Sequence, residues 1–326
     1  NSVSRGYNHI YKYNPDGRSY GDATTTLTMF QLNHFLNEKM FYDVKYSITD
    51  NDYGSYVFED YDGYEILTED GIHQGVYQFA GDTIYNYVSD KYMTAYGTGF
   101  FTGGQDKGHL NRMTKTYNFK SDFTWQVTNA HSIKTGFSFI SHELENIDHT
   151  IRNAFAGTSL EADQYKPIVL PDSTVYSDVY SVKPKERSFY IQDKFEKDEI
   201  VINLGLRYDA FDANTTYPSQ RRNPINASTY YLKDVDGLDS LDSDGNLILN
   251  ESRMSSPVQS KIASQISPRF GFAYQLGNVA VLHFSYGHFL QMPPMYSIYS
   301  NHSSIIGPSD YSCLLYTSPS PRDDPL

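Results

Sequence analysis

The sequence predicts an all-β protein whose strands form part of a transmembrane antiparallel β-barrel. About eight segments of roughly ten residues alternate apolar and polar side chains with a period of two, as strands with two different faces do. Tyr and Phe, which favour strands, are abundant at 30 and 19 residues. The connections between the segments alternate between short turns and long loops, and this alternation favours a barrel wall over a soluble sandwich.

The alternation is clearest late in the chain. From Ile200 to Tyr208 every second residue is apolar, and Asn203, Arg207 and Asp209 occupy the other face. The same pattern predicts the remaining strands, which we place at residues 26–36, 40–47, 117–127, 132–141, 188–195, 200–209, 266–276 and 280–287.

Short turns are predicted to begin at Asn37, Thr128, Glu196 and Gly277. The connections between these hairpins span residues 49–111, 143–187 and 213–264. Loops beyond about 15 residues are uncommon in compact soluble domains. Outer-membrane barrels, in contrast, have short periplasmic turns and long extracellular loops.

Composition and termini limit the function. No run of about 18 apolar residues is present, so no transmembrane helix is expected. The net charge of −13 argues against a nucleic-acid partner. The start lacks the features of a signal peptide, and "CLLYTSPSPRD" from Cys313 resembles a translated sequencing-library adaptor. We therefore expect residues 1–312 to be a partial barrel lacking both ends, and residues 313–326 not to be native protein.

Four segments in order resemble the TonB-dependent outer-membrane receptors: "SFYIQDKF", "INLGLRYD", "ISPRFGFAY" and "FSYGHFLQMPPMY". "NHFLNEKMFYDVKYS" resembles the branch with an N-terminal carboxypeptidase-regulatory-like domain, and the likeness runs from Thr24 to about Ser300. It implies a 22-stranded barrel in the Gram-negative outer membrane. An N-terminal plug would close that barrel, and energy delivered through TonB would drive nutrient import. The implied partners are outer-membrane lipid, the TonB complex, the nutrient and, as a candidate, a surface lipoprotein.

Arg207, Asp209 and Arg269 lie on the polar faces of predicted strands. In a plugged barrel they would hydrogen-bond the plug; alternatively, they pair with neighbouring charges in the lumen. Gly205, Gly271 and Gly287 share these faces, where a missing side chain permits strand coiling or the close approach of a plug.

Ligand binding is expected in the long loops, where the candidates are Tyr53, Tyr56, Tyr61 and Tyr64. Tyrosine rings stack on sugars or peptide side chains, so oligosaccharide, peptide and metal chelate all stay open as the nutrient. The alternative is an acidic, Tyr-rich surface loop without a specific ligand.

Asp242, Asp244 and Glu251 follow the spacing of an EF-hand calcium loop. Ser240 replaces the expected first Asp, and the alternative is an Asp-Gly turn in a solvated loop. Calcium is the one cofactor that the sequence suggests.

No enzymatic motif such as HExxH, GxSxG or a Walker loop is present, so we do not expect an enzyme. We place His131, His142 and His149 on a turn, a strand end and a loop, where they would not share a metal. The alternative functions are an outer-membrane barrel enzyme, a passive channel and a secreted glycan-binding β-protein.

Overall fold

The computed structural model describes residues 2–4, 6, 8–59, 65–66, 76–79, 82–85, 87, 99–101, 104–161, 164–300 and 302. Tyr61, Tyr64 and residues 313–326, for which the sequence made predictions, lie outside this described part. No helix within it is long and apolar enough to span a membrane.

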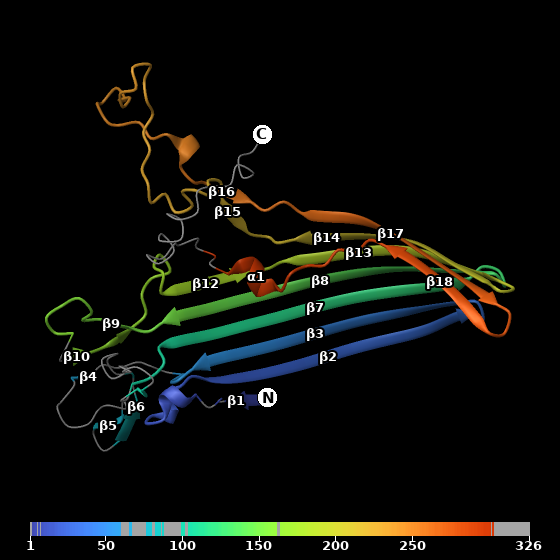
Figure 1. Cartoon of the computed structure of the whole chain (residues 1–326), viewed down its shortest axis with the longest axis horizontal. Helices are drawn as coiled ribbons and strands as arrows, with labels where there is room; N and C mark the ends of the chain where they lie inside the picture. The colour runs from blue at the N-terminus through green and yellow to red at the C-terminus, as the bar shows by residue number, and fades with distance from the viewer. Residues whose placement is uncertain are drawn as a thin grey trace.

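Long antiparallel strands form one curved wall (Figure 1). Its strands are β1 (Ser2–Ser4), β2 (Tyr20–Asn37), β3 (Met40–Tyr56), β7 (Gly108–Gln126), β8 (His131–Thr150), β12 (Ser177–Val182), β13 (Lys185–Lys197), β14 (Ile200–Asp212), β17 (Ala263–Leu276) and β18 (Ala280–Gly287). The order across the sheet is β1-β2-β3-β7-β8-β13-β14-β17-β18. Each of these strands therefore pairs with the strands that come before and after it in this series, which is also their order in the sequence. Among the described strands the path ends at β1 and β18, and the sheet is open.

Strands β12 and β13 are two parts of one strand. Both pair with β8, and the pairs Val182 with Leu144 and Lys185 with Ser141 belong to a single register. The interruption falls at Pro184, whose nitrogen carries no hydrogen to donate. Its carbonyl still accepts a hydrogen bond from the N–H of His142 at 3.0 Å.

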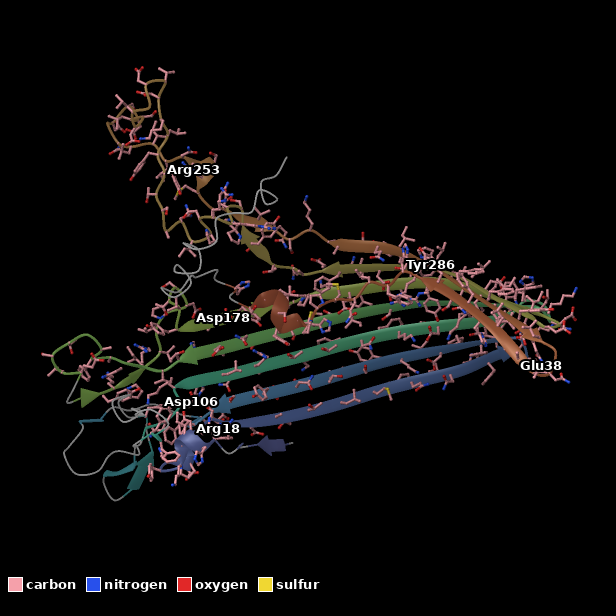
Figure 2. All side chains as sticks on the ribbon, in the orientation of Figure 1. Arg18, Glu38, Asp106, Asp178, Arg253 and Tyr286 are labelled. Atoms are coloured by element: carbon pink, nitrogen blue, oxygen red, sulfur yellow. The ribbon has the colours of Figure 1, made fainter. Side chains whose placement is uncertain are left out.

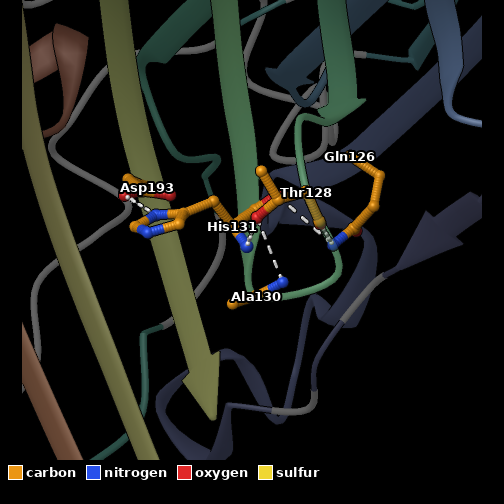
Figure 3. A network of polar contacts seen from close by, with 5 residues as sticks. All are labelled: Gln126, Thr128, Ala130, His131 and Asp193. Atoms are coloured by element: carbon orange, nitrogen blue, oxygen red, sulfur yellow. Dashed lines mark hydrogen bonds and ion pairs between the residues drawn. The ribbon is translucent and has the colours of Figure 1, made fainter.

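Short turns join the strands in pairs at one end of the wall, the turn end. Between β7 and β8, the hydroxyl of Thr128 accepts hydrogen bonds from the N–H groups of Ala130 (3.2 Å) and His131 (3.1 Å) (Figure 3). The side chain of Gln126 donates to the Thr128 carbonyl at 2.7 Å. These bonds satisfy turn groups that have no strand partner.

The opposite end, the loop end, carries the long connections. Its short elements are η1 (His9–Tyr11), η2 (Pro15–Gly17), β4 (Glu65–Ile66), β5 (Val76–Phe79), β6 (Asp82–Tyr85), β9 (Arg152–Asn153), β10 (Gln164–Tyr165) and β11 (Pro167–Ile168). Residues 213–262 form an arm that contains β15 (Thr216–Pro218), η4 (Glu251–Arg253) and β16 (Pro257–Gln259). The arm projects away from the wall, whereas Glu38 marks the turn end (Figure 2).

Buried apolar residues gather mainly at the loop end. One cluster contains Val57, Tyr87, Ile151 and Tyr165. The other contains Leu144, Tyr180, Val182 and Tyr299, the last of these from α1 (Met295–Tyr299). Among the described residues, no comparable cluster lies in the membrane-length part of the wall. This part is a single layer of strands, so side chains on its two faces point away from each other.

All predicted strands are present, and the predicted turns join them. The connections predicted at 49–111 and 143–187 are wrong in extent, because strands occupy residues 49–56, 108–111, 143–150 and 177–182. In these extensions polar residues occur on both faces beside a few apolar ones such as Leu144 and Tyr180, so the period-two hydrophobic pattern that reveals a strand is weak.

Candidate functional site

One side of the wall, the outer face, is apolar and carries Phe119, Phe137, Phe189 and Leu206. Directly opposed residues of antiparallel strands share a face, and Leu206 lies opposite Ile191 of β13. Leu204 and Leu206 are each 54 % exposed. Apolar exposure repeated over many strands requires an apolar surrounding, and the outer face is therefore suited to lipid.

The outer face includes one paired charge near the turn end. Asp193 lies between apolar neighbours, and its Oδ2 is 2.9 Å from Nδ1 of His131 (Figure 3). An unpaired carboxylate on a lipid-facing surface is unfavourable. The contact with His131 supplies its partner.

The other side, the inner face, is polar and carries Asp122, Tyr190 and Arg207. Its central row crosses the wall strand by strand, each residue directly opposite the next. This row consists of Asp43, Asp122, Gly136, Tyr190, Arg207 and Ser267.

Gly136 allows a contact across two strands within this row. The hydroxyl of Tyr190 on β13 donates to Oδ1 of Asp122 on β7 at 2.5 Å, passing over β8. A Cβ at position 136 would lie 2.4 Å from the Tyr190 ring and 2.5 Å from Oδ1 of Asp122. Lys120 also contacts Asp122 at 3.0 Å. The glycine is thus required for the hydrogen bond above it.

Arg207 and Asp209 lie on the inner face as predicted, and they pair with each other. Nε of Arg207 donates to both carboxylate oxygens of Asp209, at 2.8 and 2.9 Å. Both residues line a hollow of about 210 Å³, to which Leu290 and Met292 also contribute. The ion pair agrees with the alternative in which lumen charges satisfy one another, and contact with a plug stays a prediction.

Arg269 also lies on the inner face, with its guanidinium 4.9 Å from the ring centre of Phe289. It lines a second hollow of about 550 Å³, together with Gln192, Asn203 and Ser285. Three glycines of neighbouring strands lie along this hollow: Gly205, Gly271 and Gly287.

The chain returns over the inner face after β18. This return segment, residues 288–300, ends in α1, which packs against Leu144, Tyr180 and Val182. Tyr299 is 1 % exposed, and its hydroxyl donates to the carbonyl of Ala213 at 2.6 Å. Burial raises the pKa of Tyr299 to about 12. The segment therefore covers part of the inner face at the loop end.

Tyr53 and Tyr56 lie on strand β3, so their predicted place in a loop is wrong. They point to opposite faces because they lie three positions apart in the strand. Tyr53 is 41 % exposed, but Tyr56 is 6 % exposed and stacks on His109 with ring centres 5.0 Å apart. Burial raises the pKa of Tyr56 to about 12. Of these two rings, Tyr53 alone is available to a ligand.

Asp242 closes a turn in the arm. Its Oδ1 accepts the N–H groups of Asp244 (2.9 Å) and Asn246 (2.8 Å), and Gly245 adopts φ +85°. These backbone donors, that of Asn246 first, lower the pKa of Asp242. Asp234 closes a similar turn, accepting from Asp236 at 3.0 Å and Leu238 at 2.9 Å, which the sequence analysis missed.

The described residues bring together no group of three or more His, Cys, Asp or Glu side chains that could hold a metal ion. The Asp242 carboxylate already binds backbone N–H groups, and Glu251 begins the separate element η4. Calcium binding by Asp242, Asp244 and Glu251 stays a prediction.

The side chains of Thr116, His142 and Glu186 meet on the inner face. Their spacing in the sequence did not indicate this contact. Nδ1 of His142 lies 3.0 Å from Oγ1 of Thr116, and its Nε2 lies 3.2 Å from Oε1 of Glu186. All three sequence-predicted histidines lie within β8, not on a turn, a strand end and a loop. His131 and His149 point to the face opposite His142.

Two of the solved structures to which this chain is similar are receptors. The hemophore receptor HasR of Serratia marcescens, solved with its hemophore HasA and heme, has 12% identity and a TM-score of 0.42 over 82% of this chain and 30% of its own. The ferric-catecholate import receptor Fiu from E. coli K12 has 13% identity and a TM-score of 0.37 over 82% of this chain and 33% of its own. The chain spans about a third of either receptor.

No curated protein matches the sequence. A family model described as an outer membrane beta barrel domain matches residues 2–318. This match covers nearly the whole chain and agrees with the apolar outer face and the polar inner face. The chain belongs to the outer membrane β-barrel domain family.

Proposed function

We propose that the protein is a TonB-dependent receptor that imports a nutrient across the Gram-negative outer membrane. The observation that carries the proposal is the glycine-lined hollow of the inner face. The order of the four sequence segments that resemble TonB-dependent receptors supports it further.

A glycine inside a strand destabilises the folded protein by about 0.5–1 kcal/mol relative to alanine. The described chain has room for a side chain at two of these glycines: the atoms nearest an added Cβ lie at 3.4 Å for Gly205 and 3.5 Å for Gly271. Close approach of another backbone explains glycines at such positions. We infer that a plug lies against this hollow.

The polar inner face suits a plug that must stay in place until force is applied through TonB. Arg207 and Asp209 can offer their remaining hydrogen-bonding capacity to it, since the Arg207 side chain is 31% exposed. The nutrient is an oligosaccharide, a peptide or a metal chelate, and binding is proposed for the loop end, where Tyr53 is exposed. A surface lipoprotein is proposed as the partner there.

The proposal is tested by nutrient uptake in cells that produce the full-length protein. Uptake through a TonB-dependent receptor is expected to stop when TonB is deleted or the proton gradient is collapsed. Uptake that continues unchanged would contradict the proposal and indicate a passive channel.

The plug contact is tested in the same protein with Arg207→Ala. Removing the guanidinium is expected to increase hydrogen exchange in the plug. Lys194→Ala is the matched control, because Lys194 forms a similar ion pair with Glu196 near the turn end, at 2.5 Å. Equal plug exchange in both variants and the wild type would exclude a contact through Arg207.

A further inference from the structure

Charged residues mark where the apolar band of the outer face ends toward the loop end. On each of five strands, the first outward charge beyond the band lies in one of three successive outward rows. Asp50, Lys115 and Glu143 lie directly opposite one another, Asp212 lies one outward position nearer the turn end, and Arg187 lies two outward positions nearer. These residues, the charged collar, are Asp50, Lys115, Glu143, Arg187 and Asp212.

The collar lies one membrane thickness from the turn end. On β13, Arg187 and Lys197 bracket residues 188–196, whose outward side chains include Phe189, Ile191 and Phe195. A transmembrane strand needs about 9–11 tilted residues, which this stretch provides. The collar therefore lies at the headgroup level of the outer leaflet.

Most of the collar is paired within the chain. Lys115 contacts Asp50 at 3.6 Å, and Lys183 contacts Glu143 at 3.0 Å. Asp212 lies directly opposite Lys185, but its Oδ1 accepts the N–H of Asn214 at 2.9 Å. The carboxylates of Asp50, Glu143 and Asp212 therefore each have a partner, which weakens their repulsion of an anionic group that binds nearby.

Arg187 of the collar and its outward neighbour Lys185 differ from the other collar residues. In the part of the chain that the structure describes, neither side chain has an ion pair or a hydrogen bond. Lys183, Lys185 and Arg187 occupy successive outward positions, about 7 Å apart along the strand. Such a basic run contrasts with the net charge of −13 for the whole chain.

The surroundings of Arg187 are apolar. It lies directly opposite Phe139 of β8 and Ala210 of β14, and the next outward residue, Phe189, is 49 % exposed. A long basic side chain beside lipid extends its charged end toward the headgroups. Cationic groups thus lie directly beyond aromatic rings that acyl chains would cover.

We propose that Lys185 and Arg187 bind the phosphate of a phosphorylated lipid in the outer leaflet, whose acyl chains pack on Phe139 and Phe189. Arginine forms paired hydrogen bonds to phosphate oxygens, and lysine adds a point charge. The site follows from family membership and the outer face, and it does not depend on nutrient import.

The test uses the full-length protein in detergent, titrated with bisphosphorylated lipid A and, separately, with the same lipid after removal of its phosphates. Native mass spectrometry measures the bound lipid. The variant is Lys185→Gln with Arg187→Gln. The control, Lys134→Gln with Lys194→Gln, removes two positive charges from the inner face of β8 and β13. Heat-modifiable gel migration confirms that each protein is folded.

We expect the outer-face variant to bind the phosphorylated lipid at least about tenfold more weakly than wild type, since each basic residue near the surface contributes to anionic-lipid binding. The control should match the wild type, and dephosphorylated lipid should abolish the difference. Equal binding of lipid A by variant and wild type would overturn the proposal, as would an equal loss in the control.

Discussion

At the scale of single residues, the inner face depends on where a side chain is missing. Gly136 lies between Asp122 and Tyr190 in the central row, and it leaves the space through which their hydrogen bond passes. The bond joins β7 to β13, which are not neighbours in the sheet. One glycine therefore connects three strands through side chains as well as through the backbone.

Gly136→Ala is expected to destabilise the folded protein by about 1–3 kcal/mol, the usual effect of inserting a methyl group into an occupied space. The Tyr190 ring would have to move from Asp122. The free energy of unfolding in lipid bilayers, measured by urea titration of the full-length protein, checks this.

Gly108→Ala is the matched control for Gly136→Ala. It lies in β7, the strand next to that of Gly136, but the nearest atom to an added Cβ is 3.7 Å away. The control should change stability by no more than about 0.5 kcal/mol. A Gly136→Ala variant as stable as the control would show that the Tyr190 bond is unimportant.

The sequence predicted which residues share a face more reliably than it predicted their partners. It placed Arg207, Asp209 and Arg269 on one polar side, because the strand period settles that directly. It could not predict the meeting of Thr116, His142 and Glu186, which depends on the register of three strands. Register is set by pairing and turns, not by any one strand's pattern.

At the scale of elements, the hydrophobic period identified strands only where one face is apolar. At the collar the wall carries charged residues such as Asp50, Lys115 and Glu143, and its strands continue beyond them. Cross-strand pairing of opposite charges stabilises this part. The pattern read from the sequence therefore predicted the membrane-length portion and missed the extensions, which moved Tyr53 and Tyr56 from loop to strand.

The return segment is held at the loop end by a tyrosine that must stay neutral. The pKa of Tyr299 is raised from 10.0 to about 12. Docking is therefore fully stabilised below pH 10, where the free phenol is neutral, and it weakens as pH rises from 10 through 12. Cleavage of residues 288–300 by an alkaline protease should be faster at pH 11 than at pH 8.

Tyr299→Phe removes the hydroxyl, so position 299 can no longer ionise at high pH. This variant loses one hydrogen bond, which is worth about 1 kcal/mol, and should be cleaved somewhat faster at pH 8. It should show a much smaller further increase at pH 11. The same pH increase in both proteins would mean that another group releases the segment.

At the scale of the whole molecule, the described chain is a wall whose two clusters of buried apolar residues, around Val57 and Tyr299, lie at one end, the loop end. The part of the wall between these clusters and the turns is stabilised by strand pairing and by the surroundings of its two faces. Lipid suits one face, and the proposed plug suits the other.

The architecture of the wall could be predicted from the sequence because two faces in two environments produce a simple alternation. The arm at residues 213–262 was predicted only in part. The Asp-Gly turn at Asp242 was one of the two interpretations of the sequence, whereas the similar turn at Asp234 was missed. The path of the return segment was also missed, because it rests on contacts between Tyr299 and residues far away in the chain.

The central claim is that one face of the wall contacts lipid and the other does not. Measuring the accessibility of spin labels to oxygen at successive positions of one strand tests it most directly. Spin labels would be placed singly at residues 202 to 207 of β14 in the full-length protein in bilayers. Oxygen, which concentrates in lipid, should reach labels at 202, 204 and 206 and should reach those at 203, 205 and 207 much less. Equal accessibility at all six positions, or the opposite alternation, would contradict the assignment of this wall to the outer membrane.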